Sequence, residues 1–121
     1  MTVGAALNEF FNRFGRAYAN TSVPDDVELP YITYEVPDAS FGQNERNCTV
    51  QAWFKTASEA VPNALAKDIK GAIGQGGVIL PVDDGSIWLK RGDPWSIATT
   101  AEGDNTVKLR QMNVTIEFLT R

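Results

Sequence analysis

The last sixteen residues, 106–121, constrain the fold most, because they read as one long β-strand with no turn signal inside it. Val107 and Leu109 are expected on one face of this strand, since side chains alternate between the faces. Farther along, the apolar residues fall on the opposite face: Met112, Val114, Ile116 and Phe118. The apolar face therefore changes near Arg110–Gln111, which indicates either a β-bulge or a strand that leaves one packed surface and meets another. A strand that is apolar first on one face and then on the other suggests packing against a partner, such as another copy of the chain. A strand buried wholly in its own fold is the alternative.

Composition limits the chemistry that the chain can perform. Its 121 residues suffice for one domain, and histidine is absent, which excludes a Ser-His-Asp triad, a Cys-His pair and a His-ligated metal. The net charge of −4 arises in residues 1–60, which hold eight acidic and four basic residues, while residues 61–121 hold seven of each. A protein that grips nucleic acid by its phosphates would show a basic excess, so this balance argues against one, although DNA could pass nearby.

The single cysteine, Cys48, excludes an internal disulfide and lies in an apolar alternation, so we expect a small core residue. Hydrophobic runs are interrupted by Gly, Pro or polar residues, which predicts no membrane span. The N-terminus lacks a basic segment followed by an apolar one, which predicts no signal peptide. Synthesis in the cytoplasm fits these features.

The first half of the chain predicts a helix followed by two strands. Apolar residues at spacings of three and four indicate a helix from Val3 to Tyr18 with Thr2 as its N-cap. Residues 31–36 and 46–55 read as strands, and Trp53 falls on the face of the second strand opposite Cys48. The loop before them holds Asp25, Asp26 and Glu28, which we interpret as a solvated loop rather than a cation site, because EF-hand spacing is absent.

The second half predicts a helix, a hairpin and the long final strand. Ser58 is expected to begin the helix, whose apolar stripe comprises Val61, Leu65, Ile69, Ala72 and Ile73. The glycines of GAIGQGG follow this helix and lack a GK[ST] ending, so they indicate a helix end rather than a phosphate loop. Residues 78–82 and 87–91 pair across an Asp-Gly turn, and residues 92–105 are expected to form an irregular link.

These elements predict a two-layer α+β domain over residues 1–121, with a mostly antiparallel sheet and two amphipathic helices on one face. The other face carries Trp53, Trp88, Lys55, Lys90 and part of the last strand, a mixed polarity that suits a surface buried on assembly. The candidate subunit-interface residues are Trp53, Trp88, Trp95, Lys90, Arg91, Arg110 and Met112. We expect no catalytic, cofactor-binding or metal-binding residues.

The layout resembles the tail-terminator, or tail-completion, proteins of long-tailed bacteriophages. The matching pieces are the N-terminal helix, the acidic loop with LPYITYEV, NCTVQAWFKTASEA leading into a helix, the hairpin GSIWLKRG and the strand KLRQMNVTIEFLT. They span nearly the whole chain.

The resemblance implies a structural virion protein without enzymatic activity or cofactor. Such proteins form a hexameric ring that caps the tail tube protein and faces the head-completion or connector protein. DNA passes through the lumen without sequence-specific binding, no membrane is involved, and sheets pair or pack between subunits. The expected location is therefore the virion, at the interface between head and tail.

Other functions remain open on the sequence alone. A tail-tube or another head–tail connector subunit belongs to the same class, although the two strong helices argue against a tube protein. From a different class, a monomeric module could bind a ligand or a peptide on the face of Trp53 and Trp88. An enzyme using acidic pairs is the third class, and no spacing in the sequence selects a pair.

Overall fold

The computed structural model describes residues 1–121 except 38–44, 57, 84, 102–103 and 121. Its elements follow in the order α1 (Val3–Phe11), β1 (Ala17–Ala19), β2 (Tyr31–Tyr34), β3 (Arg46–Lys55), α2 (Ala60–Ile73), β4 (Val78–Val82), β5 (Gly85–Ala101) and β6 (Asp104–Thr120). The strands form one six-stranded sheet in the order β1-β2-β3-β6-β5-β4. The predicted α+β class is confirmed.

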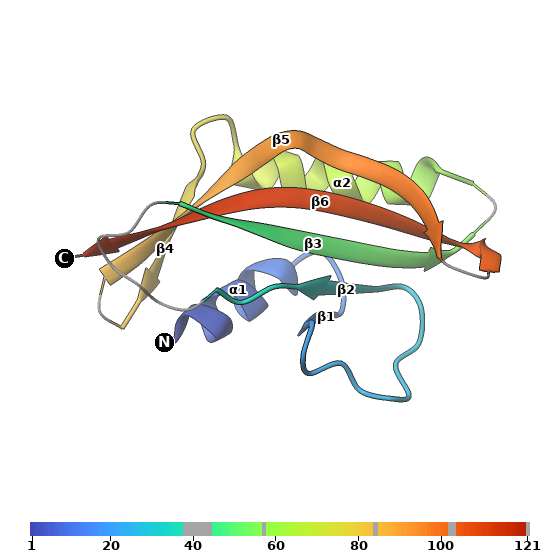
Figure 1. The fold of residues 1–121 in the computed structure, drawn as a ribbon, viewed down its shortest axis with the longest axis horizontal. Helices are drawn as coiled ribbons and strands as arrows, with labels where there is room; N and C mark the ends of the chain where they lie inside the picture. The colour runs from blue at the N-terminus through green and yellow to red at the C-terminus, as the bar shows by residue number, and fades with distance from the viewer. Residues whose placement is uncertain (38–44, 57, 84, 102–103, 121) are drawn as a thin grey trace.

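The long strands β3, β5 and β6 form the centre of the sheet (Figure 1). Only β1 and β2 pair in parallel, and every other neighbouring pair is antiparallel. The pairing of β3 with β6 runs without interruption from Arg46 opposite Ile116 to Lys55 opposite Val107. Strand β6 is therefore held on both sides along most of its length, as the middle strand of the sheet.

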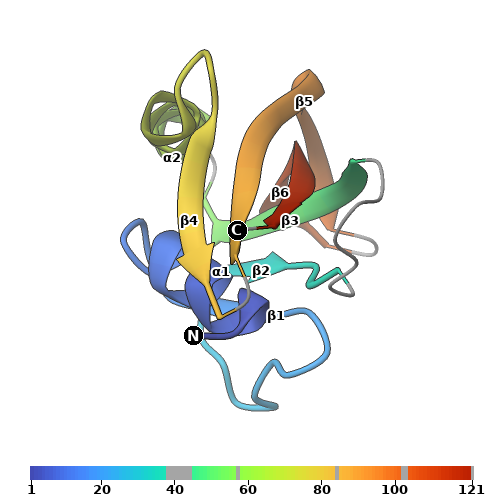
Figure 2. The ribbon, with the colours of Figure 1, turned by 90° about the vertical axis from the view of Figure 1, so that its left-hand side faces the viewer.

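Both helices lie on the same face of the sheet, which we call the covered face (Figure 2). Helix α2 packs along β5 and β6, while α1 lies against β1 and β4. Alternate residues of β3 point into this layer and are buried, as the sequence predicted: Cys48, Val50, Ala52 and Phe54. The buried side chains of both helices and of the covered face form one hydrophobic core.

Aromatic rings join α1 to the sheet. Phe10 and Phe11 are each 1% exposed, and their ring centroids lie 5.1 Å apart in an edge-to-face arrangement. The ring of Phe11 stacks on Tyr34 of β2 at 5.4 Å. Burying such rings is among the largest hydrophobic contributions that single side chains make, so α1 is anchored mainly by these contacts.

Helix α1 is shorter than the sequence predicted. Thr2 is its N-cap, as expected, and its Oγ1 accepts a hydrogen bond from the Ala5 N–H at 3.1 Å. The helix ends at Phe11 because the Asn12 side chain donates to the Asn8 carbonyl at 2.7 Å and accepts from the Ala17 N–H at 3.2 Å. Ala17 thereby enters the sheet opposite Ile32, so the predicted continuation of the helix to Tyr18 is wrong.

Helix α2 begins at Ala60, and the Ser58 hydroxyl accepts a hydrogen bond from the Ala60 N–H at 3.1 Å. The predicted stripe is partly wrong, since Val61 is 56% exposed and Ala72 is exposed as well. The buried positions of the helix are Pro62, Ala66, Ile69 and Ile73. Gly74, with φ of 77°, ends the helix as expected.

The expected irregular link over residues 92–105 is largely strand, because β5 continues to Ala101. Its pairing with β6 shifts register between Arg91 and Ser96. At this shift the backbones approach closely: a Cβ on Gly92 would lie 2.9 Å from the Asn113 Cβ, and the Asn113 amide donates to the Pro94 carbonyl at 2.8 Å. The irregularity thus lies in β5, and the bulge considered for β6 at Arg110–Gln111 is not formed.

Candidate subunit interface

The sheet face opposite the helices, the uncovered face, carries a row of large side chains across three strands. Tyr31 of β2 is opposite Trp53 of β3, which is opposite Leu109 of β6, which is opposite Thr99 of β5. The rings of Tyr31 and Trp53 are stacked, with centroids 6.1 Å apart and planes at 17°. We call Tyr31, Trp53 and Leu109 the aromatic row. All three side chains are only half-buried, so one side of the row remains open.

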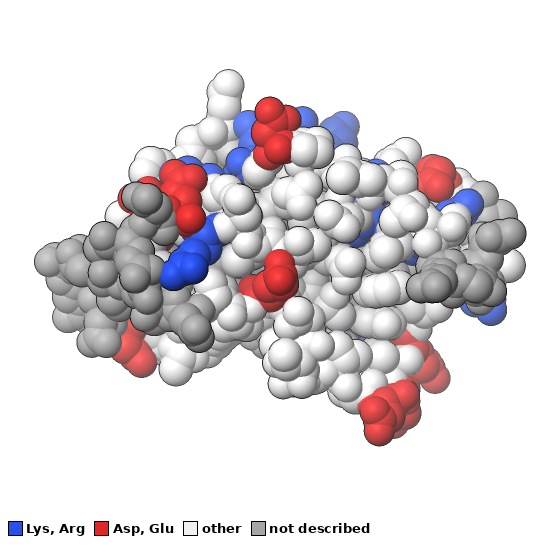
Figure 3. Space-filling model, in the orientation of Figure 1, with Lys and Arg blue, Asp and Glu red and all other residues white. Residues whose placement is uncertain are grey.

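The surroundings of the aromatic row include both polar and apolar groups. The indole Nε1 of Trp53 is buried and has no hydrogen-bond partner among the residues that the structure describes. Next to the row, Ile97 of β5 is 46% exposed. Figure 3 shows that uncharged side chains dominate this face, with acidic side chains near its centre and at its margins, including the lower margin over the loop between β1 and β2. The face is therefore mainly uncharged with scattered charges, a mixed polarity that suits a protein–protein interface.

Trp88 and Lys90 form a second cluster at the β5 edge. The Trp88 Nε1 donates to the Gly76 carbonyl at 2.9 Å, and the Lys90 Nζ lies 4.2 Å from the centre of the Trp88 ring. Lys90 also pairs with Glu45 and, at 3.7 Å, with Glu117. These two predicted interface residues therefore have contacts within their own chain, although both remain half-buried.

A pocket of about 480 Å³ wraps around this edge of the sheet, and we call it the basic pocket. It forms because β4 pairs with β5 only as far as Leu89, which leaves the next part of β5 without a strand neighbour on that side. Its lining residues are Lys70, Gln75, Gly76, Trp88, Lys90, Arg91, Gly92, Asp93 and Trp95. The pocket thus combines three cations, one carboxylate and two indoles.

Trp95 serves a mainly structural role within this pocket. It is half-buried, packs against the core, and donates from Nε1 to the Ala66 carbonyl of α2 at 3.3 Å. Trp53 lies apart from it, opposite Leu109, whereas Trp88 is opposite Glu117 near the other end of β6. The three tryptophans consequently divide between the aromatic row and the basic pocket rather than forming one surface.

Two of the predicted interface residues are wrong. Met112 is 0% exposed and belongs to the core, because it points to the covered face beneath the helices. Arg110 is 7% exposed on the same face, and its Nη2 donates to Glu59 Oε2 at 3.0 Å and to Asn63 Oδ1 at 2.7 Å. The covered face thus becomes polar beneath the start of α2, and this is why the apolar pattern of β6 seemed to change faces in the sequence.

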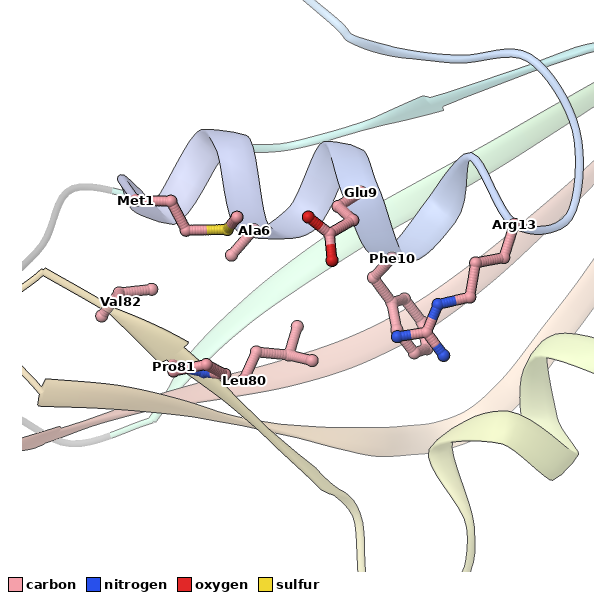
Figure 4. Close-up of a pocket in the computed structure, with 8 residues that line it drawn as sticks. All are labelled: Met1, Ala6, Glu9, Phe10, Arg13, Leu80, Pro81 and Val82. Carbon is pink, nitrogen blue, oxygen red and sulfur yellow. The ribbon is translucent and has the colours of Figure 1, made fainter.

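A second pocket, of about 310 Å³, lies between α1 and β4 (Figure 4). Met1 and Ala6 line it from the side of α1, and Leu80, Pro81 and Val82 line it from β4. Two charged residues complete it: Glu9 and Arg13, whose guanidinium carbon lies 5.0 Å from the centre of the Phe10 ring. This pocket is an apolar notch with a charged rim.

Among the described residues, the other positions considered in the sequence analysis do not form a binding site. Cys48 is buried, and desolvation, with a smaller contribution from Glu35, raises the pKa of its thiol to about 11 despite the opposing effect of Arg46. Asp25, Asp26 and Glu28 lie exposed in the loop before β2. Within the described ranges, no three acidic or cysteine residues are close enough to hold a metal ion, and no helix is long and apolar enough to cross a membrane.

Comparison of the chain with known protein families and with curated proteins finds no match.

Proposed function

We propose that this protein is a tail terminator of a long-tailed bacteriophage, one subunit of a homo-oligomeric, hexameric ring that caps the tail tube and joins it to the head connector. The observation that carries the proposal is the uncovered sheet face. One face of the sheet is packed by α1 and α2, whereas the aromatic row on the other face is left half-buried within a single chain.

The chemistry of the aromatic row favours a protein partner over solvent. Tyrosine and tryptophan are enriched at interfaces, because each has a large apolar surface and a polar atom that can still pair. The rings of Tyr31 and Trp53 stack on each other and are only half-buried, so part of their apolar surface is available to a partner.

Further features agree with a ring that surrounds DNA. The net charge of −4 repels the phosphate backbone, so DNA could slide through a lumen without adhering to it. The resemblance of the sequence to tail terminators supplies the identity of the neighbours, which are the tail tube protein on one side and the head-completion or connector protein on the other. The location that follows is the virion.

The first test is the mass of the protein in solution, measured by light scattering on a sizing column over a wide concentration range. A mass near six chains, with rings visible by negative-stain electron microscopy, supports the proposal and argues against a monomeric binding module. Because a terminator can also assemble only on its template, the second test adds the protein to tail tubes that lack a terminator. A protein that is monomeric at every concentration and does not bind tube ends contradicts the proposal.

A further inference from the structure

We propose that the basic pocket of one copy of the chain receives the acidic loop, residues 24–28, of the next copy, so that the ring closes through a head-to-tail contact. This inference rests on the proposed function, since it names the contact by which neighbouring subunits would recognise one another. Its occupant is a second copy of this chain, and the arguments are charge complementarity and the placement of the two surfaces in the fold.

Two cations of the basic pocket have no ion-pair partner in the part of the chain that the structure describes. Lys90 is already occupied by Glu45 and Glu117. By contrast, neither Lys70 nor Arg91 forms an ion pair with any residue in the described parts of the chain. Asp93 reduces the positive charge of the pocket without cancelling it. The indoles of Trp88 and Trp95 supply apolar walls, which lower the local dielectric constant and strengthen an ion pair formed between them.

The acidic loop is built to present its carboxylates. Its backbone is held by Arg16, which donates from Nη2 to the Glu28 carbonyl at 2.8 Å and to the Pro30 carbonyl at 3.2 Å. The Val27 N–H donates to the Pro24 carbonyl at 3.3 Å, which closes a turn with Asp25 and Asp26 at its tip. Both aspartates and Glu28 are exposed, and no ion pair engages them in the part of the chain that the structure describes.

The two surfaces lie at opposite edges of the sheet. The acidic loop connects β1 and β2, at the edge where β1 ends the sheet, and the basic pocket flanks β5 where β4 leaves it. In Figure 1 the loop projects at the lower right, and the turn between α2 and β4 rises at the upper left. Two different, complementary patches on separate sides of one molecule make a heterologous contact, which produces a ring when the rotation between subunits closes.

The test reverses charges on each surface and measures the concentration dependence of mass. Lys70→Glu is compared with Lys67→Glu, an equal charge change on an exposed residue of the same helix outside the pocket. Asp25→Lys is compared with Asp68→Lys, an equal charge change on an exposed residue of α2, outside the acidic loop. We expect the two test variants to weaken association by roughly tenfold or more at low salt, and the two controls to leave it nearly unchanged. Circular dichroism and the melting temperature show whether each variant remains folded.

Double variants then test the direction of the contact. The pocket variant Lys70→Glu/Arg91→Glu retains an intact loop, and the loop variant Asp25→Lys/Asp26→Lys retains an intact pocket. Each alone is expected to be monomeric, because its loop and its pocket carry charges of the same sign. Their equimolar mixture is expected to form a ring of alternating variants, because the acidic loop of one meets the basic pocket of the other and the basic loop meets the acidic pocket. A chain that carries all four substitutions is expected to recover the ring, since its loop and its pocket have both changed sign.

Three results overturn the contact while leaving the proposed function to its own test. One is a ring-forming protein in which Lys70→Glu weakens association no more than Lys67→Glu does. Another is a mixture of the two double variants that shows no association although both are folded. The third is a wild-type protein without charge-dependent association up to millimolar concentration; binding to tail tube ends then still decides whether the protein is a terminator.

Discussion

The two faces of the central strands have the same length and the same backbone but opposite surroundings. On the covered face, side chains such as Val50 and Met112 are at most 1% exposed beneath the helices. On the uncovered face, Trp53 and Leu109 stand at neighbouring positions of the same two strands and are only half-buried. Both faces hold large apolar residues, so hydrophobicity alone does not distinguish them.

The apolar content of a strand therefore indicates how many of its faces are packed. It does not show which of these faces belongs to the core of the chain itself. The covered face is completed within the chain by α1 and α2 (Figure 2). In the part of the chain that the structure describes, no helix covers the opposite face, which is the basis for proposing a partner there. Substitutions on the two faces should therefore separate folding from association.

The largest effect on folding is expected on the covered side. Phe10→Ala removes a ring that is 1% exposed and in contact with Phe11 and Phe14, so the free energy of unfolding should fall by about 3–5 kcal/mol. Urea denaturation followed by circular dichroism measures this loss. The neighbouring, exposed Glu9→Ala is the control and should stay within about 0.5 kcal/mol. A loss below about 1 kcal/mol for Phe10→Ala would mean that α1 is not packed as described.

A smaller effect is expected where the covered face becomes polar. Arg110→Ala removes hydrogen bonds to Glu59 and Asn63 and should lower the free energy of unfolding by about 2 kcal/mol, a value reduced because Glu59 is 47% exposed. Lys108→Ala is the matched control, since Lys108 faces the same carboxylate at 3.8 Å and should cost below about 1 kcal/mol. Equal losses for both variants would show that burial of Arg110 contributes nothing.

On the uncovered face, Trp53→Ala should weaken self-association more than folding. We expect a loss of about 1 kcal/mol in the free energy of unfolding, because the side chain is half-buried, and a weakening of association by roughly tenfold or more. Trp88→Ala should also weaken association, with a larger share lost in folding, since it removes the hydrogen bond to Gly76. Light scattering and thermal melting measure the two quantities. Normal assembly combined with early melting for both variants would place the tryptophans in the core instead.

The smallest effect concerns Cys48 and appears only at high pH. Its thiol has a pKa raised to about 11, against about 8.5 in an unfolded chain, so the folded state binds the proton more tightly. The resulting stability is fully present below the unfolded pKa and is lost as pH rises toward 11. The free energy of unfolding of the wild type should therefore approach that of Cys48→Ala when the pH is raised from 8 to 10.5. Denaturation of both proteins at the two pH values measures this change. A stability difference that does not change with pH would contradict the raised pKa.

Local sequence patterns were sufficient to predict much of the fold. Strand β3 begins and ends where alternation predicted, at Arg46 and Lys55, since one of its faces is buried throughout. The N-cap at Thr2 and the helix end at Gly74 were also predicted, because capping depends on hydrogen bonds and dihedral angles of adjacent residues. The opposite orientations of Cys48 and Trp53 followed from the period of a strand alone.

The predictions were wrong where contacts between residues distant in the sequence determine the local structure. The end of α1 depends on Asn12 bonding Ala17 and on Ala17 pairing with Ile32, which local helix periodicity does not contain. The extension of β5 beyond Arg91 depends on β6 continuing beside it, so a segment with turn-forming residues became strand. Of the predicted interface, the aromatic row was detectable at Trp53, whereas Leu109 and Tyr31 joined it only through strand register.

The amino-acid sequence by itself determined the alternation of polar and apolar residues, the helix caps and the absence of histidine, because these are properties of neighbouring positions or of composition. The tertiary structure decided which face of β6 the helices cover, and hence that Arg110 and Met112 are buried. It also decided that residues as distant as Lys70 and Arg91 line one pocket. Period-two alternation defines two faces of a strand without ranking them, and only the packing of other elements selects the face that becomes the core.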